Sequence, residues 1–185
     1  MLGVLGLQGD VIEHVSMLKM LKEDVKIVKT GDDIKNIKGL IIPGGESTTI
    51  GKLIVKNKID KAIKDAEPYI FGTCAGAILL AKKIVNSEQF SLNLMDIEIE
   101  RNAYGRQRES FEVYLDIPKL GIKNFKAIFI RAPVITKVNK GEVLAEYKTP
   151  VLVRQEKYLA CTFHPELTHD TRIHEYFVRM VKNED

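Results

Sequence analysis

Residues 71–81 read FGTCAGAILLA, and Cys74 lies between two glycines where an apolar run changes into a helical pattern. The spacing Gly72-x-Cys74-x-Gly76 is typical of a strand–turn–helix corner that carries a nucleophile. Glycine suits such a corner because it tolerates unusual dihedrals and lets backbones approach closely. The corner would also place the cysteine at a helix start, where backbone N–H groups favour the thiolate. A buried structural cysteine beside packing glycines fits this pentapeptide equally well.

The chain on both sides of this corner alternates between short apolar runs and helical patterns. Strands are expected at residues 2–7, 25–28, 39–42 and 69–71, and helices at residues 11–21, 58–66 and 75–83. Helices between strands imply parallel pairing, because each helix carries the chain back across the sheet. The strands are almost wholly apolar, which indicates a sheet that is covered on both faces.

The second half of the chain is richer in strands. They are expected at residues 97–100, 111–115, 127–130, 143–147, 151–155 and 158–163, before a last amphipathic helix at 172–182. The stretch TPVLVRQEKYLACTFHP predicts a hairpin that turns at Glu156-Lys157. No repeat or linker interrupts the pattern, so residues 1–185 are expected to form one α/β domain with a mostly parallel sheet and an antiparallel extension.

Composition and charge exclude several classes of protein. The 185 residues include 28 basic and 25 acidic side chains, and the resulting charge of +3 is interleaved along the chain. A nucleic-acid surface would need a one-sided basic stripe, so none is expected. Residues 1–7 do not resemble a signal peptide, and no apolar run approaches the ~20 residues that span a bilayer. We therefore expect a cytoplasmic protein without a membrane anchor, and no disulfide between Cys74 and Cys161.

A histidine and a carboxylate follow the last expected strand, in the stretch CTFHPELT. His164 and Glu166 are two residues apart, a spacing that points side chains to the same side of an extended segment. A carboxylate there can orient the imidazole and stabilise its protonated form, as a base paired with a cysteine requires. His-Pro-Glu alone is more often an ordinary loop, but together with the Cys74 corner it favours catalysis.

A pair of glycines follows another strand, in LIIPGGEST at residues 40–48. Pro43 ends the strand, and Gly44-Gly45 can turn backbone N–H groups toward a ligand, which is a common source of oxyanion stabilisation. A simple β-turn explains the same residues. A phosphate-binding loop is not expected, because the G-x-x-x-x-G-K-[ST] spacing is absent.

The motifs PGGEST, GTCAG and FHPE, in this order, resemble those of the triad glutamine amidotransferases. The stretches GLQGD (6–10), ERNAYGRQRESF (100–111), FIRAP (129–133) and FHPELT (163–168) are more specific. They make nearly the whole chain similar to the glutaminase subunits of pyridoxal 5'-phosphate synthases. The resemblance implies a three-layer α/β/α sandwich of the flavodoxin-like glutamine amidotransferase type, which hydrolyses L-glutamine and passes ammonia to a synthase subunit in a large hetero-oligomer. It implies no cofactor, since pyridoxal 5'-phosphate would be the product of the pathway.

The resemblance also implies a role for individual residues. Cys74 would be the nucleophile, His164 the general base and acid, and Glu166 the residue that orients it. Backbone N–H groups of Gly45 and Ala75 would form the oxyanion hole, and Gln8 would lie near the partner interface and the active site. Glutamine would be held by a group of residues around the cleft: Gly45, Glu46, Ser47, Arg101, Ile130 and Arg131.

The arginines have a chemical argument of their own. A guanidinium matches the α-carboxylate of glutamine with two parallel hydrogen bonds, and Arg131 ends an apolar strand, where open α/β sheets bind ligands. Arg101, Arg106 and Arg108 are too close together for all three to serve the substrate, so some would be solvated or contact a partner.

The remaining candidates are weaker. The other histidines, His14, His169 and His174, are expected to be surface or capping residues, and Cys161 to be core. No cluster has the spacing of zinc ligands, so no metal is predicted. Three alternative functions stay open: a glutaminase subunit of another pathway such as histidine biosynthesis, a regulatory protein of the DJ-1 type, and, least favoured, a cysteine peptidase.

Overall fold

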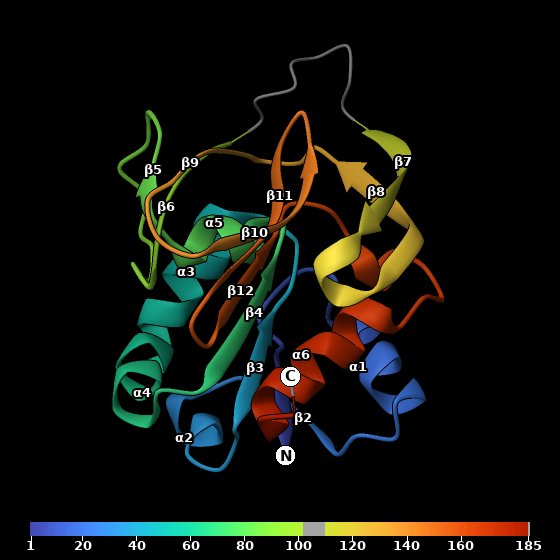
Figure 1. The fold of residues 1–185 in the computed structure, drawn as a ribbon. Coiled ribbons are helices and arrows are strands. Elements are labelled where there is room, and N and C mark those ends of the chain that lie inside the picture. The colour runs from blue at the N-terminus through green and yellow to red at the C-terminus, as the bar shows by residue number, and fades with distance from the viewer. Residues whose placement is uncertain (102–109, 185) are drawn as a thin grey trace.

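A central sheet of seven strands runs through the computed structural model, which describes residues 1–101 and 110–184 (Figure 1). The strand order within these residues is β10–β11–β12–β4–β3–β1–β2. Five neighbouring strands pair in parallel: β12 (Tyr158–Cys161), β4 (Tyr69–Thr73), β3 (Gly39–Ile42), β1 (Leu2–Leu5) and β2 (Val25–Val28). Two antiparallel strands extend the β12 edge: β10 (Glu142–Tyr147) and β11 (Thr149–Gln155).

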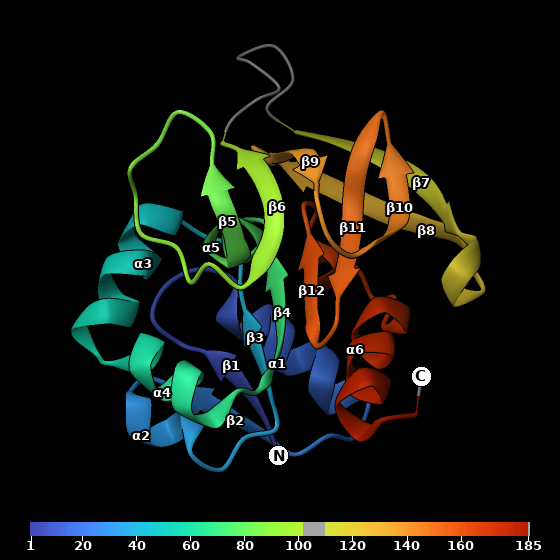
Figure 2. The same cartoon turned by 60° about the vertical axis from the view of Figure 1, so that its left-hand side comes forward.

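Helices cover both faces of this sheet, as Figures 1 and 2 show. One face packs against α1 (Val11–Met20) and α6 (Arg172–Lys182). The other face carries α2 (Gly31–Ile34), α3 (Ser47–Lys56), α4 (Ile59–Ala66) and α5 (Ala75–Leu80). Alternate strand residues divide between the two cores, so that Ile41 and Phe71 pack with α6, while Leu40 and Ile70 pack with α3 and α4. This arrangement confirms the predicted three-layer sandwich and its antiparallel extension.

Two smaller sheets flank the central one. The hairpin of β7 (Ser110–Ile117) and β8 (Ile122–Ile130), joined through the 3₁₀ turn Pro118–Leu120, packs on the α1–α6 side. The strands β5 (Ala81–Ile84), β6 (Met95–Glu100) and β9 (Val134–Val138) form the other small sheet, on the α5 side. Another 3₁₀ turn, Pro165–Leu167, follows β12 and leads toward α6.

The structure corrects several of the expected elements. The helix expected at residues 75–83 ends at Leu80, because Ala81 is extended and begins β5. Lys82 and Lys83 are exposed and form ion pairs with Asp96 and Glu98 on the neighbouring strand. The helix α3 was not expected from the sequence. It begins at Ser47 because the Glu46 carboxylate accepts hydrogen bonds from two backbone N–H groups of its first turn.

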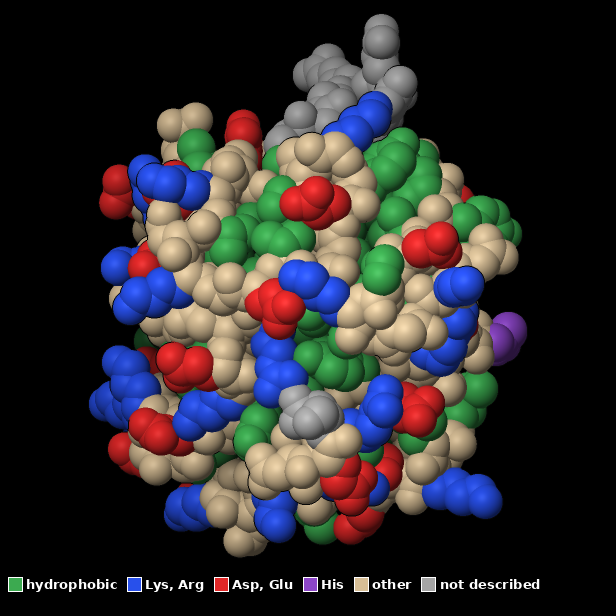
Figure 3. Space-filling view, viewed as in Figure 1, with side chains coloured by type: hydrophobic (Ala, Val, Ile, Leu, Met, Phe, Trp, Pro, Cys, Tyr) green, Lys and Arg blue, Asp and Glu red, His purple; other side chains and the backbone are tan. Residues whose placement is uncertain are grey.

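Acidic and basic side chains are interspersed over the face shown in Figure 3. Among the described helices, none combines the length and the apolar character needed to cross a bilayer.

Candidate active site

Cys74 lies at the corner between β4 and α5, in a backbone conformation with φ of 49° and ψ of −104°. Such a positive φ is uncommon for a residue with a side chain, and strained backbone of this kind is found repeatedly at active sites. The backbone N–H of Cys74 donates to the carbonyl oxygen of Cys161 on β12, at 2.8 Å. The corner predicted from the sequence is therefore present, and a neighbouring strand holds it in place.

The two glycines beside Cys74 are required by close packing. A Cβ on Gly72 would lie 2.5 Å from the carbonyl of Gly76, and a Cβ on Gly76 would overlap the carbonyl oxygen of Ile42 on β3. Backbone cannot move aside as a flexible side chain can. These two positions let α5 start directly on top of the sheet, which brings Cys74 to its carboxyl edge.

We expect Gly76→Ala to lower the free energy of unfolding by about 3 kcal/mol or more, because the added methyl group meets backbone. Urea denaturation of the purified chain measures this loss. Gly121→Ala is the matched control, since a Cβ there meets nothing within 4 Å and only the φ of +65° is unfavourable, at about 1 kcal/mol. Equal losses in the two variants would contradict the packing argument.

His164 follows β12 and reaches the same edge of the sheet. Its Nδ1 lies 2.6 Å from Oε1 of Glu166 and 3.3 Å from Oδ2 of Asp10, and its ring forms a side-chain hydrogen bond with Cys74. Because Nδ1 faces two carboxylates, Nε2 is the nitrogen left for the cysteine. The backbone N–H of His164 donates to the carbonyl oxygen of Ile128 on β8, at 2.8 Å. The structure thus brings together the three residues of the predicted triad.

The contact between His164 and Glu166 arises differently from our expectation. The segment is not extended, because Pro165–Leu167 form a 3₁₀ turn that begins directly after His164. This turn folds the Glu166 side chain back under the imidazole. Glu166 is buried, at 4% exposed, and His164 is equally buried at 4%.

Burial and hydrogen bonding have opposite effects on the pKa values of His164 and Glu166. Burial acts to lower the pKa of His164, but hydrogen bonds with Asp10, Cys74 and Glu166 outweigh it and raise the pKa to about 12. Burial raises the pKa of Glu166, and the neighbouring His164 partly offsets this. The protonated imidazole is therefore the favoured form next to the cysteine.

A cleft of about 360 Å³ opens beside Cys74, a size within the range of small-molecule sites. Besides Cys74, its walls contain His164 and all the residues expected to bind glutamine or to form the oxyanion hole: Gly45, Glu46, Ser47, Ala75, Arg101, Ile130 and Arg131. The carbonyl oxygen of Ile130 lies 4.0 Å from Sγ of Cys74. Arg106 and Arg108 fall outside the described residues.

Gln8 lies against the glycine pair that follows β3. Its Oε1 accepts a hydrogen bond from the backbone N–H of Glu46, at 2.8 Å, and it occupies the space that a Cβ on Gly45 would need. The backbone of Gly9 is also close, since a Cβ on Gly45 would lie 3.0 Å from its Cα. Gln8 therefore fixes the loop that carries the expected oxyanion donor Gly45.

The Glu46 carboxylate forms hydrogen bonds within the protein and does not project freely into the cleft. It accepts hydrogen bonds from the backbone N–H groups of Thr48 and Thr49 and from the Thr49 hydroxyl. These bonds, led by the one from the Thr49 side chain, lower the pKa of Glu46 to about 2. Arg101 lies 3.4 Å from the same carboxylate.

Gln89 is a residue of the site that no sequence motif marks. Its Oε1 accepts a hydrogen bond from Nη1 of Arg101 at 2.6 Å, and its amide nitrogen donates to the hydroxyl of Ser47 at 3.2 Å. It therefore links two residues expected to bind glutamine. Asp10 was also missed as a site residue, although it belongs to the GLQGD stretch.

The expectation that His14 and His174 are surface or capping residues is wrong. Both are 0% exposed and lie side by side beneath the triad, with Nδ1 of His14 2.9 Å from Nε2 of His174. Burial lowers the pKa of His14 and lowers the pKa of His174 to about 3. His169 is exposed, and Cys161 is buried, as expected.

We expect acid to destabilise the protein through His174. Unfolded His174 takes up a proton below pH ~6.5, whereas the folded side chain stays neutral until about pH 3, so stability is lost as the pH falls through this window. Between pH 7 and 4.5 the loss from this residue is about 2–3 kcal/mol. Urea denaturation at both pH values measures it. His174→Gln should reduce the loss of unfolding free energy between the two pH values, and His169→Gln should not. An unchanged loss in His174→Gln would contradict the argument.

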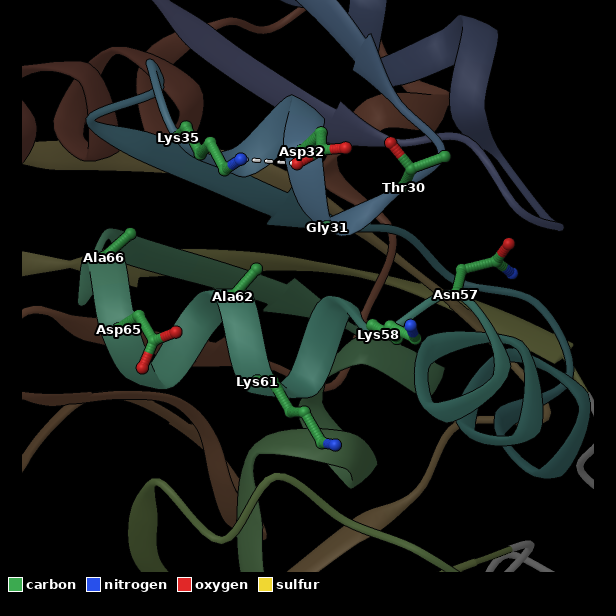
Figure 4. Close-up of a pocket in the computed structure, with 10 residues that line it drawn as sticks. All are labelled: Thr30, Gly31, Asp32, Lys35, Asn57, Lys58, Lys61, Ala62, Asp65 and Ala66. Atoms are coloured by element: carbon green, nitrogen blue, oxygen red, sulfur yellow. Dashed lines mark ion pairs between the residues drawn. The ribbon is translucent and has the colours of Figure 1, made fainter.

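An acidic and histidine cluster at the triad and a surface hollow elsewhere can be compared with the cleft beside Cys74 as candidate sites. Asp10, His164 and Glu166 place three possible metal-ligating atoms within 4.8 Å of one another, but these atoms already pair with each other around the Nδ1 proton. A hollow of about 580 Å³ lies between α2 and α4 (Figure 4), and it shares no lining residue with the cleft beside Cys74. Its lysines and aspartates are mixed in sign, and Lys35 is paired with Asp32 at 2.6 Å.

Comparison with known proteins agrees with this geometry. Residues 4–183 match the model of the SNO glutamine amidotransferase family. The chain belongs to that family. Among relatives within it, the "Pyridoxal 5'-phosphate synthase subunit PdxT" of Pseudothermotoga lettingae is 58% identical over 97% of this chain and 94% of its own. The protein of the same name from Thermotoga petrophila is 51% identical over 98% and 99%.

One solved structure supports the same family, and a more distant one shows the same fold. A crystal structure described as a glutamine amidotransferase superposes with a TM-score of 0.92, at 48% identity and over 98% of both chains. The structure of PurLQS from Thermotoga maritima contains a chain that gives a TM-score of 0.67 at 14% identity, over 96% of both chains, a likeness that shows the fold alone.

Proposed function

We propose that this chain is the glutaminase subunit of a pyridoxal 5'-phosphate synthase. It hydrolyses L-glutamine to L-glutamate and ammonia with Cys74, His164 and Glu166. The observation that carries the proposal is the placement of His164 between the Cys74 side chain and a buried carboxylate, at the edge of a cleft lined by arginines. Membership of a glutamine amidotransferase family, and relatives named as subunits of this synthase, support the choice of substrate and pathway.

The first half of the reaction transfers the glutamyl group to the enzyme. The sulfur of Cys74 attacks the side-chain amide carbon of glutamine, and backbone N–H groups of Gly45 and Ala75 stabilise the oxyanion. Protonated His164 gives its proton to the departing nitrogen, which leaves as ammonia. Glu166 holds Nδ1 of His164, so that Nε2 faces the reacting atoms.

The second half restores the enzyme. Neutral His164 takes a proton from water, and the resulting hydroxide attacks the thioester carbon. The carbon–sulfur bond breaks, glutamate leaves, and the proton on His164 restores the starting state. Each bond-breaking step is thus served by a side chain or a backbone N–H group of this chain.

Substrate recognition follows from the charges of the cleft. The α-carboxylate of glutamine needs a guanidinium, which Arg101 or Arg131, both in the wall of the cleft, supplies. Gln89 orients Arg101 through its 2.6 Å hydrogen bond, and Ser47 and Glu46 complete the wall beside Gly45. Ile130 contributes its backbone carbonyl next to Cys74.

The ammonia is used by a separate synthase subunit with which this chain forms a hetero-oligomer. Ammonia that escapes to bulk water is protonated, so direct transfer to the partner preserves its reactivity. Gln8 lies beside the cleft and is exposed, a position from which contact with the partner can reach the Gly45 loop. We place the complex in the cytoplasm, where the two free cysteines stay reduced.

A glutaminase assay tests the proposal. Ammonia and glutamate release are measured for the purified chain alone and with the synthase subunit, using L-asparagine as the matched control substrate. We expect glutamine-dependent release that is higher in the complex and absent with asparagine. A complex that forms but releases no ammonia from glutamine would refute the proposal. The alternatives of histidine-pathway glutaminase, DJ-1-like regulator and peptidase are less consistent with the relatives found.

A further inference from the structure

Two fully buried histidines lie directly behind the triad, from α1 and α6 on the same face of the sheet. His14 places Nδ1 2.9 Å from Nε2 of His174 and Nε2 3.0 Å from the hydroxyl oxygen of Thr73, the residue before the nucleophile. Nε2 of His14 also lies 3.6 Å from Oε2 of Glu166. The proposed reaction uses neither histidine, yet both are enclosed at 0% exposure.

The hydrogen bonds determine which nitrogens carry the protons. Nδ1 of His174 is buried and has no hydrogen-bond partner among the described residues. A buried N–H without a partner is rarer than an acceptor without one, so we assign the proton of His174 to Nε2. His174 then donates to Nδ1 of His14, and the proton of neutral His14 must lie on Nε2. That N–H faces Thr73 and Glu166.

Glu166 needs such a group. Its Oε1 accepts the bond from His164, but its Oε2 is buried and has no hydrogen-bond partner among the described residues. A buried carboxylate oxygen that lacks a donor is costly. The N–H of His14 is 3.6 Å away, too long for a good hydrogen bond but close enough to act on a charge in a buried site.

We propose that His14 is a positioning residue of the glutaminase reaction: held in one tautomer by His174, it keeps the Glu166 carboxylate oriented toward His164. The inference rests on the function proposed above. His14 touches neither the substrate nor Cys74, and acts only through Glu166. Contacts thus lead inward from Cys74 through His164 and Glu166 to His14 and His174, which lie between α1 and α6.

The titratable groups around Glu166 decide the expected effect on pH dependence. They come from α1 (His14), from α6 (His174), from the loop before α1 (Asp10), and from the strands and turns of the triad (Cys74, Cys161, His164). Burial and Asp10 favour protonated Glu166, while His164 favours the carboxylate. Loss of the N–H of His14 removes a group that supports the carboxylate, so Glu166 would take up a proton at higher pH.

The test uses kcat and KM for glutamine, measured between pH 5 and 9 on the complex with the synthase subunit. His14→Leu removes the N–H, whereas His14→Gln keeps one near the position of Nε2. We expect kcat of His14→Leu to fall ~10–100-fold with KM within ~2-fold, and the acid limb of its profile to move to higher pH. His14→Gln should retain kcat within ~5-fold. His169→Leu, an exposed histidine, is the control for the substitution itself.

A purely structural role would lower the unfolding temperature and leave the pH profile in place. Unchanged kcat and pH profile in His14→Leu, or equal losses in the Leu and Gln variants, would overturn the inference. If His14→Leu does not fold, His14→Asn replaces it, because its shorter amide reaches His174 but not Glu166, and it should lose activity where His14→Gln does not.

A measurement on the unaltered protein separates this inference from the proposed function. In ¹⁵N NMR spectra, His14 and His174 should both show the neutral Nε2–H tautomer, and an Nδ1–H tautomer at His14 would overturn the inference. A wild-type complex that releases no ammonia would refute the function alone. An active wild type with an unaffected His14→Leu variant would refute only the inference.

Discussion

Replacement of Cys74 by alanine is expected to lower glutamine-dependent ammonia release at least ~10⁴-fold, because the alanine side chain cannot form the thioester. Binding of glutamine should survive, since the rest of the cleft wall is unchanged. The measurement is ammonia release by the complex under saturating glutamine. The fold should persist as well, because the corner is held by the backbone bond to Cys161 and by the packing of Gly72 and Gly76, not by the sulfur.

Cys161 provides the matched control for this experiment. It is also a free, buried cysteine, but its Sγ lies 3.4 Å from the carbonyl oxygen of Phe163, and burial raises the pKa of its thiol. Cys161→Ser should keep most of the activity, and Cys74→Ser should not. An electrophilic analogue of glutamine should modify Cys74 and leave Cys161 unmodified. Substantial ammonia release by Cys74→Ala would remove this residue from the mechanism.

Glu166→Gln is expected to lower kcat ~10²–10⁴-fold while leaving the structure in place. The carboxylate fixes the proton of His164 on Nδ1, at 2.6 Å, which leaves Nε2 for the cysteine. The amide of glutamine can instead donate to Nδ1 and hold the opposite tautomer. Steady-state kcat of the complex measures the loss, and circular dichroism and the unfolding temperature check the fold.

Asp10 is the informative comparison, because its carboxylate also faces Nδ1 of His164. It is more distant, at 3.3 Å, and its side chain is 32% exposed, so Asp10→Asn should cost less than ~10-fold. The double variant should be the least active of the three. If Asp10→Asn loses as much activity as Glu166→Gln, then Glu166 is not the single carboxylate that orients His164, and the two carboxylates share that role.

The sequence was informative where one residue type satisfies a local requirement. The glycines around Cys74, the apolar strands and the Gly44-Gly45 turn each have a short-range physical reason, and the corner, the parallel sheet and the cleft lie where these patterns indicated. The expected contact between His164 and Glu166 is present, although through a 3₁₀ turn that two-residue spacing does not predict.

What the sequence could not provide depends on contacts between distant segments. His14 and His174 are 160 positions apart and become buried only because α1 and α6 pack on the same face of the sheet. Each histidine, taken within its own helix, has a polar character that suggests the surface. Gln89 lies in a loop without a motif, and its role arises only from the position of Arg101. The early end of α5 reflects pairing between β5 and β6, which is likewise a long-range contact.

Backbone hydrogen bonds hold both Cys74 and His164 in place. This has a consequence for cells that contain both the active protein and an inactive variant. Cys74 and His164 are held by peptide N–H groups bound to Cys161 and Ile128, so loss of either side chain leaves the outer shape of the molecule intact. An inactive variant would then bind the synthase subunit in the same way as the active protein. Expressed in excess beside the normal gene, the inactive protein would compete with the active one for the synthase subunit and so lower the supply of ammonia to it.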